Sequence, residues 1–150
     1  QYKHDYFALS KWDPKHAGKQ IEISQDGKTA SIKGPGWECV ALSKVLKPDG
    51  KVHVFRFQVQ TESPGVMIGL CSQWENIQHR YPGIGSHGLT WHAQTKSIAY
   101  YDNRAKDSFL YLVVDFDSWV VYGLCFKDTV LVETLVLEMD SVCQQQKQWF

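Results

Sequence analysis

Turn-forming residues divide this sequence at short intervals, and their spacing limits the fold more than any other feature. Gly stands beside Pro or Asp in the segments QDGK, KGPG, KPDG, ESPG and YPGIG. Such pairs favour tight turns, because Gly accepts backbone angles that other residues avoid and Pro fixes one of them. The runs between the turns are short and rich in Val, Ile, Phe, Tyr and Thr. This pattern is typical of an antiparallel β-sandwich or barrel.

Ten strands are predicted from these runs, with few or no helices. In FRFQVQ, Phe55, Phe57 and Val59 alternate with polar residues, which indicates a strand with one face in the core and one in water. The runs 66–71 and 119–126 are apolar nearly throughout, so both of their faces are expected to be covered by other layers. The predicted strands are Gln20–Ser24, Thr29–Lys33, Glu38–Leu42, Val52–Gln60, Val66–Cys71, Gly88–Trp91, Ser97–Tyr101, Ser108–Asp115, Trp119–Phe126 and Thr129–Glu138.

The chain has 150 residues without an internal repeat or linker, so a single domain over 1–150 is expected. It begins with Gln1 rather than Met and has no signal peptide, which suggests a domain excised from a longer chain. Lys plus Arg equal Asp plus Glu at 16 each, so no net field attracts nucleic acid or an anionic membrane. The longest apolar runs, such as Phe109–Val114, cannot cross a bilayer, which takes about 20 residues. The tail after Met139 is expected to be a short helix or a loose end.

The four cysteines, Cys39, Cys71, Cys125 and Cys143, form no C-x-x-C pair and no regular framework. Free Cys behaves as a small apolar residue, and two of the four lie inside apolar runs. Free buried thiols in a reducing compartment are therefore expected, with disulfides as the alternative. This interpretation predicts an intracellular protein of the cytoplasm or nucleus.

The segment YPGIGSHGLTWH contains the spacing G-x-G-x-x-G at Gly83, Gly85 and Gly88. A dinucleotide loop needs a strand before these glycines and a helix after them, because the helix N-terminus holds the pyrophosphate. Here Tyr81-Pro82 precedes the motif, and a strand-like run follows it. The context contradicts a nucleotide site, and no cofactor is expected.

The histidines, paired aspartates and possible nucleophiles of the chain also lack the spacing that metal binding or catalysis would need. His87 and His92 are five residues apart, which places them on opposite faces of a strand, and no nearby Cys or carboxylate completes a zinc site. Asp115 and Asp117 share a strand face, but such a pair more often ends a strand and opens a turn, here with Ser118. No G-x-S-x-G motif or Cys–His spacing assigns a nucleophile and its base. Neither a metal site nor a catalytic site is expected.

The order of the segments resembles the SPRY (B30.2) domain family. WDPKHAGKQIEISQDGKTASI resembles the aromatic-Asp-Pro opening and first strands of that family, and WECVALS is similar to its next strand. DGKVHVFRFQVQTESPGVMIGLCS resembles its central hairpin, and YPGIGSHGLTW its Tyr-loop-Gly-Ser-x-Gly-Leu segment. LYLVVDFDSWVVYGLCFKD is similar to its late hairpin. The resemblance runs from about Trp12 to Leu137 and rests on the order of these pieces.

This resemblance implies a two-sheet antiparallel β-sandwich that acts as a non-catalytic protein-interaction module, such as an adaptor or scaffold. Loops at one end of the sandwich would bind a partner peptide or loop, and the domain would be a monomeric part of a larger protein or complex. A Tyr lines the pocket of some family members at the place of Tyr81. By position, Arg80, His87 and Trp74 are further candidates. Trp74 has the alternative role of a cap on the sheet.

Three other functions remain open from the sequence. A lectin-like sandwich would bind sugar by aromatic stacking, and Asp102 and Asn103 beside Tyr100 and Tyr101 hint at it. An enzyme on a β-sandwich is the second, and RNA binding is the third, although the basic residues are scattered.

Overall fold

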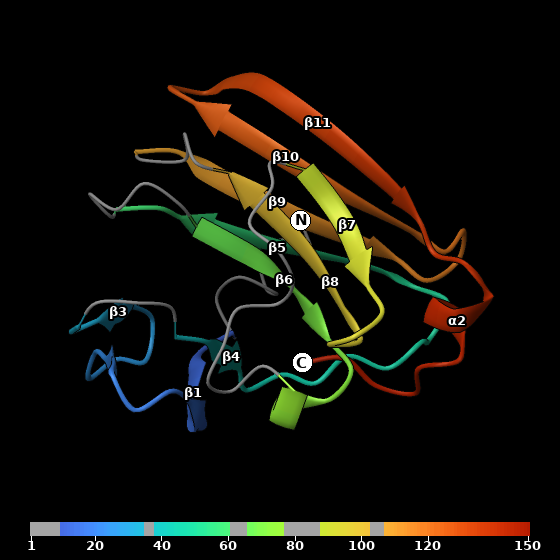
Figure 1. Ribbon diagram of the computed structural model, residues 1–150. Coiled ribbons are helices and arrows are strands. Elements are labelled where there is room, and N and C mark those ends of the chain that lie inside the picture. The colour runs from blue at the N-terminus through green and yellow to red at the C-terminus, as the bar shows by residue number, and fades with distance from the viewer. Residues whose placement is uncertain (1–9, 35–37, 61–65, 77–87, 103–106) are drawn as a thin grey trace.

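The computed structural model describes residues 10–34, 38–60, 66–76, 88–102 and 107–150, and it is a two-layer antiparallel β-sandwich (Figure 1). One layer is a four-stranded sheet in the order β11-β10-β9-β5, and the other is a three-stranded sheet in the order β6-β8-β7. Two small sheets, β1-β4 and β2-β3, lie beside them at the lower left of Figure 1. This architecture confirms the predicted all-β sandwich. The strands are β1 (Trp12–Ala17), β2 (Ile21–Ile23), β3 (Ala30–Ile32), β4 (Val40–Leu42), β5 (Val52–Gln58), β6 (Val66–Cys71), β7 (Gly88–His92), β8 (Ser97–Asp102), β9 (Phe109–Asp115), β10 (Val120–Lys127) and β11 (Val130–Glu138), and the helical turns are η1 (Trp74–Asn76) and α2 (Ser141–Gln144).

All ten predicted strands are present, with ends that agree to within a residue or two. The strand that the sequence analysis missed is β1, whose Asp-Pro pair has the appearance of a turn. It pairs with β4 in an irregular register, Trp12 with Leu42 and Ala17 with Val40. Pro14 has no N–H to give to a ladder, so a strand that contains it belongs at an edge and pairs irregularly.

The core lies between the two sheets, where alternate residues of each strand point inward. Strand pairing aligns Phe55, Leu112, Gly123 and Leu135 in one row across the four-stranded sheet. The inward residues of β9 and β10 are almost fully buried; Leu112, for example, is 1% exposed. The opposite sheet adds inward residues that meet this row, namely Ile68, Leu70, Leu89, Ile98 and Tyr100.

Tyr100 connects the two layers at the centre of the core. Its side chain is 0% exposed and lies against Gly123 of β10. Its hydroxyl donates a hydrogen bond of 3.0 Å to Oε1 of Glu133 on β11. A side chain at position 123 would occupy the space of the phenol ring, so the glycine sets the distance between the sheets at this point.

We predict that Gly123→Ala destabilises the fold by about 1–3 kcal/mol, the usual cost of overpacking a core. A β-carbon at Gly123 would lie 2.6 Å from Cδ2 of Tyr100, and the buried ring has little room to move. Urea unfolding should show a lower midpoint with an unchanged slope. Gly34→Ala is the matched control, because the nearest atoms there belong to the flexible end of Gln20. Equal stability of the two variants would contradict this account of the core.

The strands β5 and β6 do not form the hairpin that the resemblance suggested. β5 pairs with β9, whereas β6 pairs with β8 in the opposite sheet. Both strands contribute apolar residues to the same core, but they do so from opposite sheets rather than side by side. The late hairpin is present as predicted, because β9 and β10 pair from Phe109 with Phe126 to Asp115 with Val120.

The C-terminal tail begins with the short helix α2 and then docks into the core. Asp140 caps the helix, since its Oδ1 accepts hydrogen bonds of 3.0 Å from the N–H groups of Val142 and Cys143. Trp149 then pairs with Leu46 through two backbone hydrogen bonds of 2.8 Å. Of the two predicted alternatives, a short helix is therefore the one observed.

Candidate functional site

Among the sequence-predicted binding residues, the structure describes Trp74, while Arg80, Tyr81 and His87 lie outside the described residues. Trp74 begins the 3-10 turn η1, three residues after the end of β6 at Cys71, and is 7% exposed. It belongs to a small second core, which it forms with Ala41, Cys71, Cys39 and Phe150. Its buried indole therefore stabilises the fold. Direct contact of Trp74 with a partner stays a prediction.

A histidine and an aspartate of β1 border this second core. The His16 ring meets Trp74 edge-on at 5.5 Å and Phe150 at 5.2 Å between ring centroids. Nδ1 of His16 lies 2.8 Å from Oδ2 of Asp13, and the N–H of Lys15 donates to Oδ1 of Asp13 at 2.9 Å. The hydrogen bond to His16 is the main reason that the pKa of Asp13 lies below its ordinary value of 3.8. We call His16, Asp13, Trp74 and Phe150 the Trp74 corner.

The thiols beside the Trp74 corner are held in their neutral form. Burial, together with the nearby Cys71 and Glu38, raises the pKa of Cys39 to about 12. Burial likewise raises the pKa of Cys71 to about 11, and its Sγ donates to the carbonyl of Gln73 at 2.8 Å. A nucleophilic cysteine needs a thiolate, which a lowered pKa would supply. The raised pKa values favour neutral thiols near neutral pH, and these side chains pack against Trp74 in the second core.

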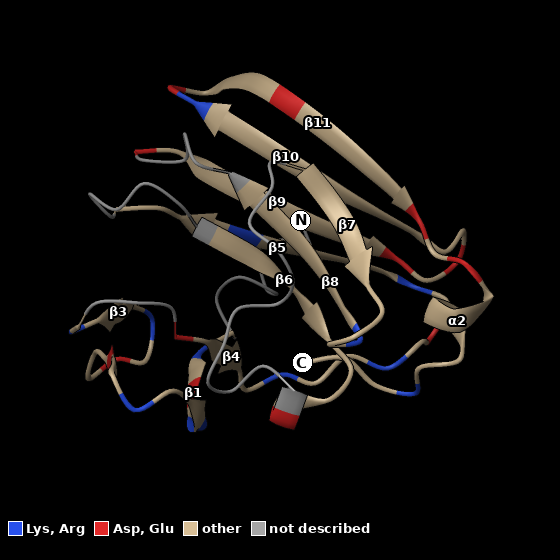
Figure 2. Ribbon diagram, viewed as in Figure 1, with Lys and Arg blue, Asp and Glu red and all other residues tan. Residues whose placement is uncertain are grey.

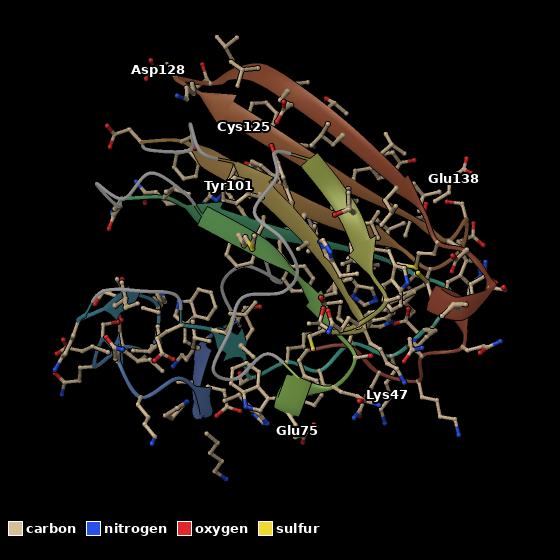
Figure 3. The ribbon with its side chains drawn as sticks, viewed as in Figure 1. Lys47, Glu75, Tyr101, Cys125, Asp128 and Glu138 are labelled. Carbon is tan, nitrogen blue, oxygen red and sulfur yellow. The ribbon has the colours of Figure 1, made fainter. Side chains whose placement is uncertain are left out.

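Glu75 follows Trp74 and lies on the exposed side of η1, at the lower edge of the molecule in Figure 3. Trp74 itself points into the second core, so the side chains of Trp74 and Glu75 lie on opposite sides of η1, one in the interior and one in solvent. The chain that continues from η1 reaches β7 at Gly88, after residues 77–87. The Trp74 corner thus fixes the place of the residues that come directly before segment 77–87.

Gly88 begins a strand and not a helix. Its φ is +141°, and β7 continues from it in antiparallel pairing with β8, Gly88 opposite Tyr101 and His92 opposite Ser97. The G-x-G-x-x-G spacing is thus followed by the strand that the sequence predicted, which is the wrong element for a pyrophosphate. Gly83 and Gly85 lie outside the described residues.

His92 ends β7 and bonds within its own strand. Its Nε2 lies 2.9 Å from Oγ1 of Thr90, and burial lowers its pKa, which favours the neutral ring. Across the residues that the structure describes, no group of three His, Cys, Asp or Glu side chains is placed to hold a metal ion. His87, its neighbour in the sequence motif, lies outside those residues.

The carboxylate pair at the end of β9 forms a turn, as the sequence analysis favoured. Oδ1 of Asp115 accepts from the N–H groups of Asp117 and Ser118, at 2.9 and 3.0 Å. Its Oδ2 accepts from the Ser118 hydroxyl at 2.6 Å, which is the main cause of the lowered pKa of Asp115. Asp115 thus orders the β9–β10 turn, while Asp117 is exposed.

The hint of a sugar site at Tyr100 and Tyr101 is corrected by their positions. Tyr100 is 0% exposed inside the core, so its ring cannot stack on a sugar. Tyr101 lies on the opposite face of β8 and is half-buried (labelled in Figure 3). Neighbouring strand residues point to opposite faces, so the two rings could not have formed one platform. Asn103 lies outside the described residues.

Comparison with known proteins adds no relative: neither a protein-family model nor a curated protein matches the chain. The described part of the chain also contains no helix long and apolar enough to span a membrane. The described cysteines are all free, with Cys39 half-buried and Cys71, Cys125 and Cys143 buried. This confirms the prediction of free thiols.

The Asp13–His16 pair predicts a loss of stability in acid. Because the pKa of Asp13 is lower in the folded chain than its ordinary value of 3.8, its carboxylate stabilises the fold above that pH. This stabilisation is lost as the pH falls through the lower folded value. Urea unfolding measured between about pH 5 and pH 2 should therefore show a shallower decline for Asp13→Asn than for wild type.

The control for this measurement is Asp117→Asn, which removes an exposed carboxylate from the β9–β10 turn. Its decline should follow that of wild type more closely than Asp13→Asn does. If Asp13→Asn and wild type lose stability in parallel below about pH 4, the hydrogen bond to His16 does not carry the effect.

Proposed function

We propose that the chain is a non-catalytic protein-interaction module of the SPRY (B30.2) kind, which binds a partner peptide or loop. Segment 77–87 would be the main contact, with Tyr81 as the first anchor and Arg80 and His87 beside it. Trp74 would act as the support that orients the segment. In this role the domain serves as an adaptor or scaffold within a larger protein or assembly.

The observation that carries this proposal is that both flanks of segment 77–87 are fixed in the sandwich. On one side, Trp74 is packed into the second core against Phe150 and Cys71. On the other side, β7 begins at Gly88 and pairs along its length with β8. Binding residues concentrate on loops that a rigid scaffold holds in place. Tyr also offers a large contact area with few rotatable bonds.

The free cysteines support an intracellular setting, in the cytoplasm or nucleus, as part of this proposal. Disulfides form and persist in oxidising compartments and are rare where glutathione keeps thiols reduced. The thiols of Cys71, Cys125 and Cys143 are buried and remain unpaired by disulfides.

The test is a quantitative pull-down from a native extract with the wild-type chain and with Tyr81→Ala. Truncation of a true anchor costs about 2 kcal/mol or more of binding, which is about a 30-fold rise in Kd. We expect a specific protein partner to be captured by wild type and lost with Tyr81→Ala. Tyr101→Ala is the control, because it removes a half-buried tyrosine from β8 and keeps every residue of segment 77–87.

Capture that Tyr81→Ala leaves unchanged would move the contact away from segment 77–87. Failure to capture any protein, together with binding on a glycan array, would replace the proposal by the lectin-like alternative. Thermal unfolding of both variants separates loss of binding from loss of the fold.

A further inference from the structure

The four-stranded sheet has one closed face and one open face. Its inward residues on β9 and β10 are nearly inaccessible, as for Val114 and Val121 at 0% exposure. The outward residues alternate with these along each strand and are all half-buried or exposed. We call the outward side chains of β5, β9, β10 and β11 the outer face. Its two central rows are Val54, Val113, Tyr122 and Val136, and Arg56, Tyr111, Leu124 and Thr134.

The outer face is more apolar than a solvent-facing sheet needs to be. Val132 and Val136 on β11 are 53% and 56% exposed. Sheets with one wet face normally alternate apolar and polar residues, whereas β10 has Tyr122, Leu124 and Phe126 on its wet side. Figure 2 shows little charge along β10, and acidic residues near the end where β9 turns into β10. The face is thus largely apolar, half-buried on β9 and β10 and exposed on β11, and exposed apolar surface that gathers on one face marks an interaction surface.

We propose that the outer face packs against the same face of a second copy of this chain, which gives a homodimer of stacked sheets. The sequence alone suggested a monomer; it also predicted that 119–126 would be covered on both faces, and a second copy supplies that cover. A strand of about seven residues that rises about 3.3 Å per residue is about 23 Å long. Four strands spaced about 4.8 Å apart are about 19 Å wide, so the face measures about 23 by 19 Å.

This size meets the lower limit for a specific dimer. Two such faces have a flat area of about 900 Å², and side chains make the accessible area larger, close to the roughly 1,000 Å² that a biological interface needs. Weak, transient interfaces lie at this low end of the size range, so we expect a dimer with a Kd in the micromolar range. Stacked sheets pack about 10 Å apart with their strands within about 30° of each other, which a twisted four-stranded sheet can achieve.

The charges on the outer face select how the two copies are oriented. Strand pairing puts Asp115 and Glu138 in the row at one end of the face, and Phe109 in the row at the other. The guanidinium of exposed Arg56 lies 5.1 Å from the centroid of the Phe109 ring. A twofold axis along the strands would set the two acidic rows against each other.

A twofold axis across the strands removes this repulsion. It sets Asp115 of each copy opposite Phe109 of the other, where the second copy's Arg56 lies. The twofold symmetry then gives two Arg56–Asp115 contacts, because Arg56 of each copy lies near Asp115 of the other. Complementary charges of this kind fix the register of an interface more than they raise its affinity.

The experiment is sedimentation velocity of the full 150-residue chain between about 1 and 300 µM, a range that brackets the expected micromolar Kd. Wild type should shift from monomer to dimer as the concentration rises. Val136→Lys should raise the dimer Kd at least tenfold, about 1.4 kcal/mol, because it places an unpaired charge in the interface. Val142→Lys is the matched control: it changes a valine of similar exposure, 47%, on α2.

Arg56→Glu tests the orientation, because it sets an acid against Asp115 of the second copy. We expect it to weaken the dimer, and less so at high salt, since salt screens exposed charges. Circular dichroism of each variant checks that the fold is kept. A wild-type monomer throughout the range would overturn the proposal, and so would a dimer that Val136→Lys leaves intact. A dimer that is weakened by Val136→Lys but not by Arg56→Glu would overturn the orientation.

Discussion

Replacement of Trp149 by Ala should destabilise the fold by about 3–5 kcal/mol, the usual cost of truncating a buried aromatic residue. Trp149 lies one residue from the end of the sequence, yet it is 0% exposed and belongs to the main core. Its ring meets Trp91 of β7 edge-on, with centroids 6.1 Å apart. Few residues of the sandwich bring more buried volume to one position.

Two features make the cost of this truncation high. The backbone of Trp149 is held by Leu46 through a pair of 2.8 Å hydrogen bonds, so the tail cannot move in to fill the space. The surrounding side chains come from several elements and cannot all relax toward one cavity. A cavity that stays open adds its own cost to the lost burial.

Urea unfolding of Trp149→Ala and Trp149→Phe measures this effect. Among the described residues Nε1 of Trp149 has no hydrogen-bond partner, so the Phe variant removes volume without breaking a hydrogen bond. We expect Trp149→Phe to cost less than half as much as Trp149→Ala. Val142→Ala, at an exposed position of α2, should leave the midpoint nearly unchanged. A loss below about 1 kcal/mol for Trp149→Ala would mean that the tail is not part of the cooperative core.

The strands could be predicted from the sequence because each depends on a local pattern. Alternation in 55–60 reflects the side-chain period of two, and the dense apolar runs in 66–71 and 119–126 indicate strands buried on both faces. The pairing of strands depends on residues far apart in the chain, so it could not be read in the same way. The separation of β5 and β6 into opposite sheets is an example, since they are neighbours in sequence and look like a hairpin.

Long-range contacts explain the other differences. The hydrogen bond from Tyr100 to Glu133 joins strands 33 residues apart, and no local signal in "AYYDN" shows that the first tyrosine is buried and the second is not. The docking of Trp149 beside Leu46 is equally remote in sequence. In the candidate site, the segment SQWEN indicated an aromatic residue near a turn. The burial of Trp74 against Phe150 depends on where the C-terminal tail docks in the fold, and the sequence pattern does not show this.

The thiols of Cys39, Cys71 and Cys143 should react with alkylating reagents far more slowly in the folded chain than in the unfolded chain. Burial raises the pKa of Cys39 from an ordinary 9.0 to about 12, and those of Cys71 and Cys143 to about 11. Only the thiolate reacts with the reagent. Its fraction at pH 8 falls about tenfold for each unit by which the pKa is raised. We expect labelling to slow by about 10³ at Cys39 and about 10² at the other two, before restricted access is counted.

Iodoacetamide labelling followed by mass spectrometry of the peptides tests this, with the same chain in urea as the reference. All four cysteines should be labelled in urea without a reducing agent, because each is free. Fast labelling of folded Cys39 or Cys71 would show a thiolate beside His16 and Trp74, and the Trp74 corner would then have to be treated as a reactive site. Slow labelling at both positions would instead support the corner as a packed base, in which Cys39 and Cys71 are buried beside Trp74 and Phe150.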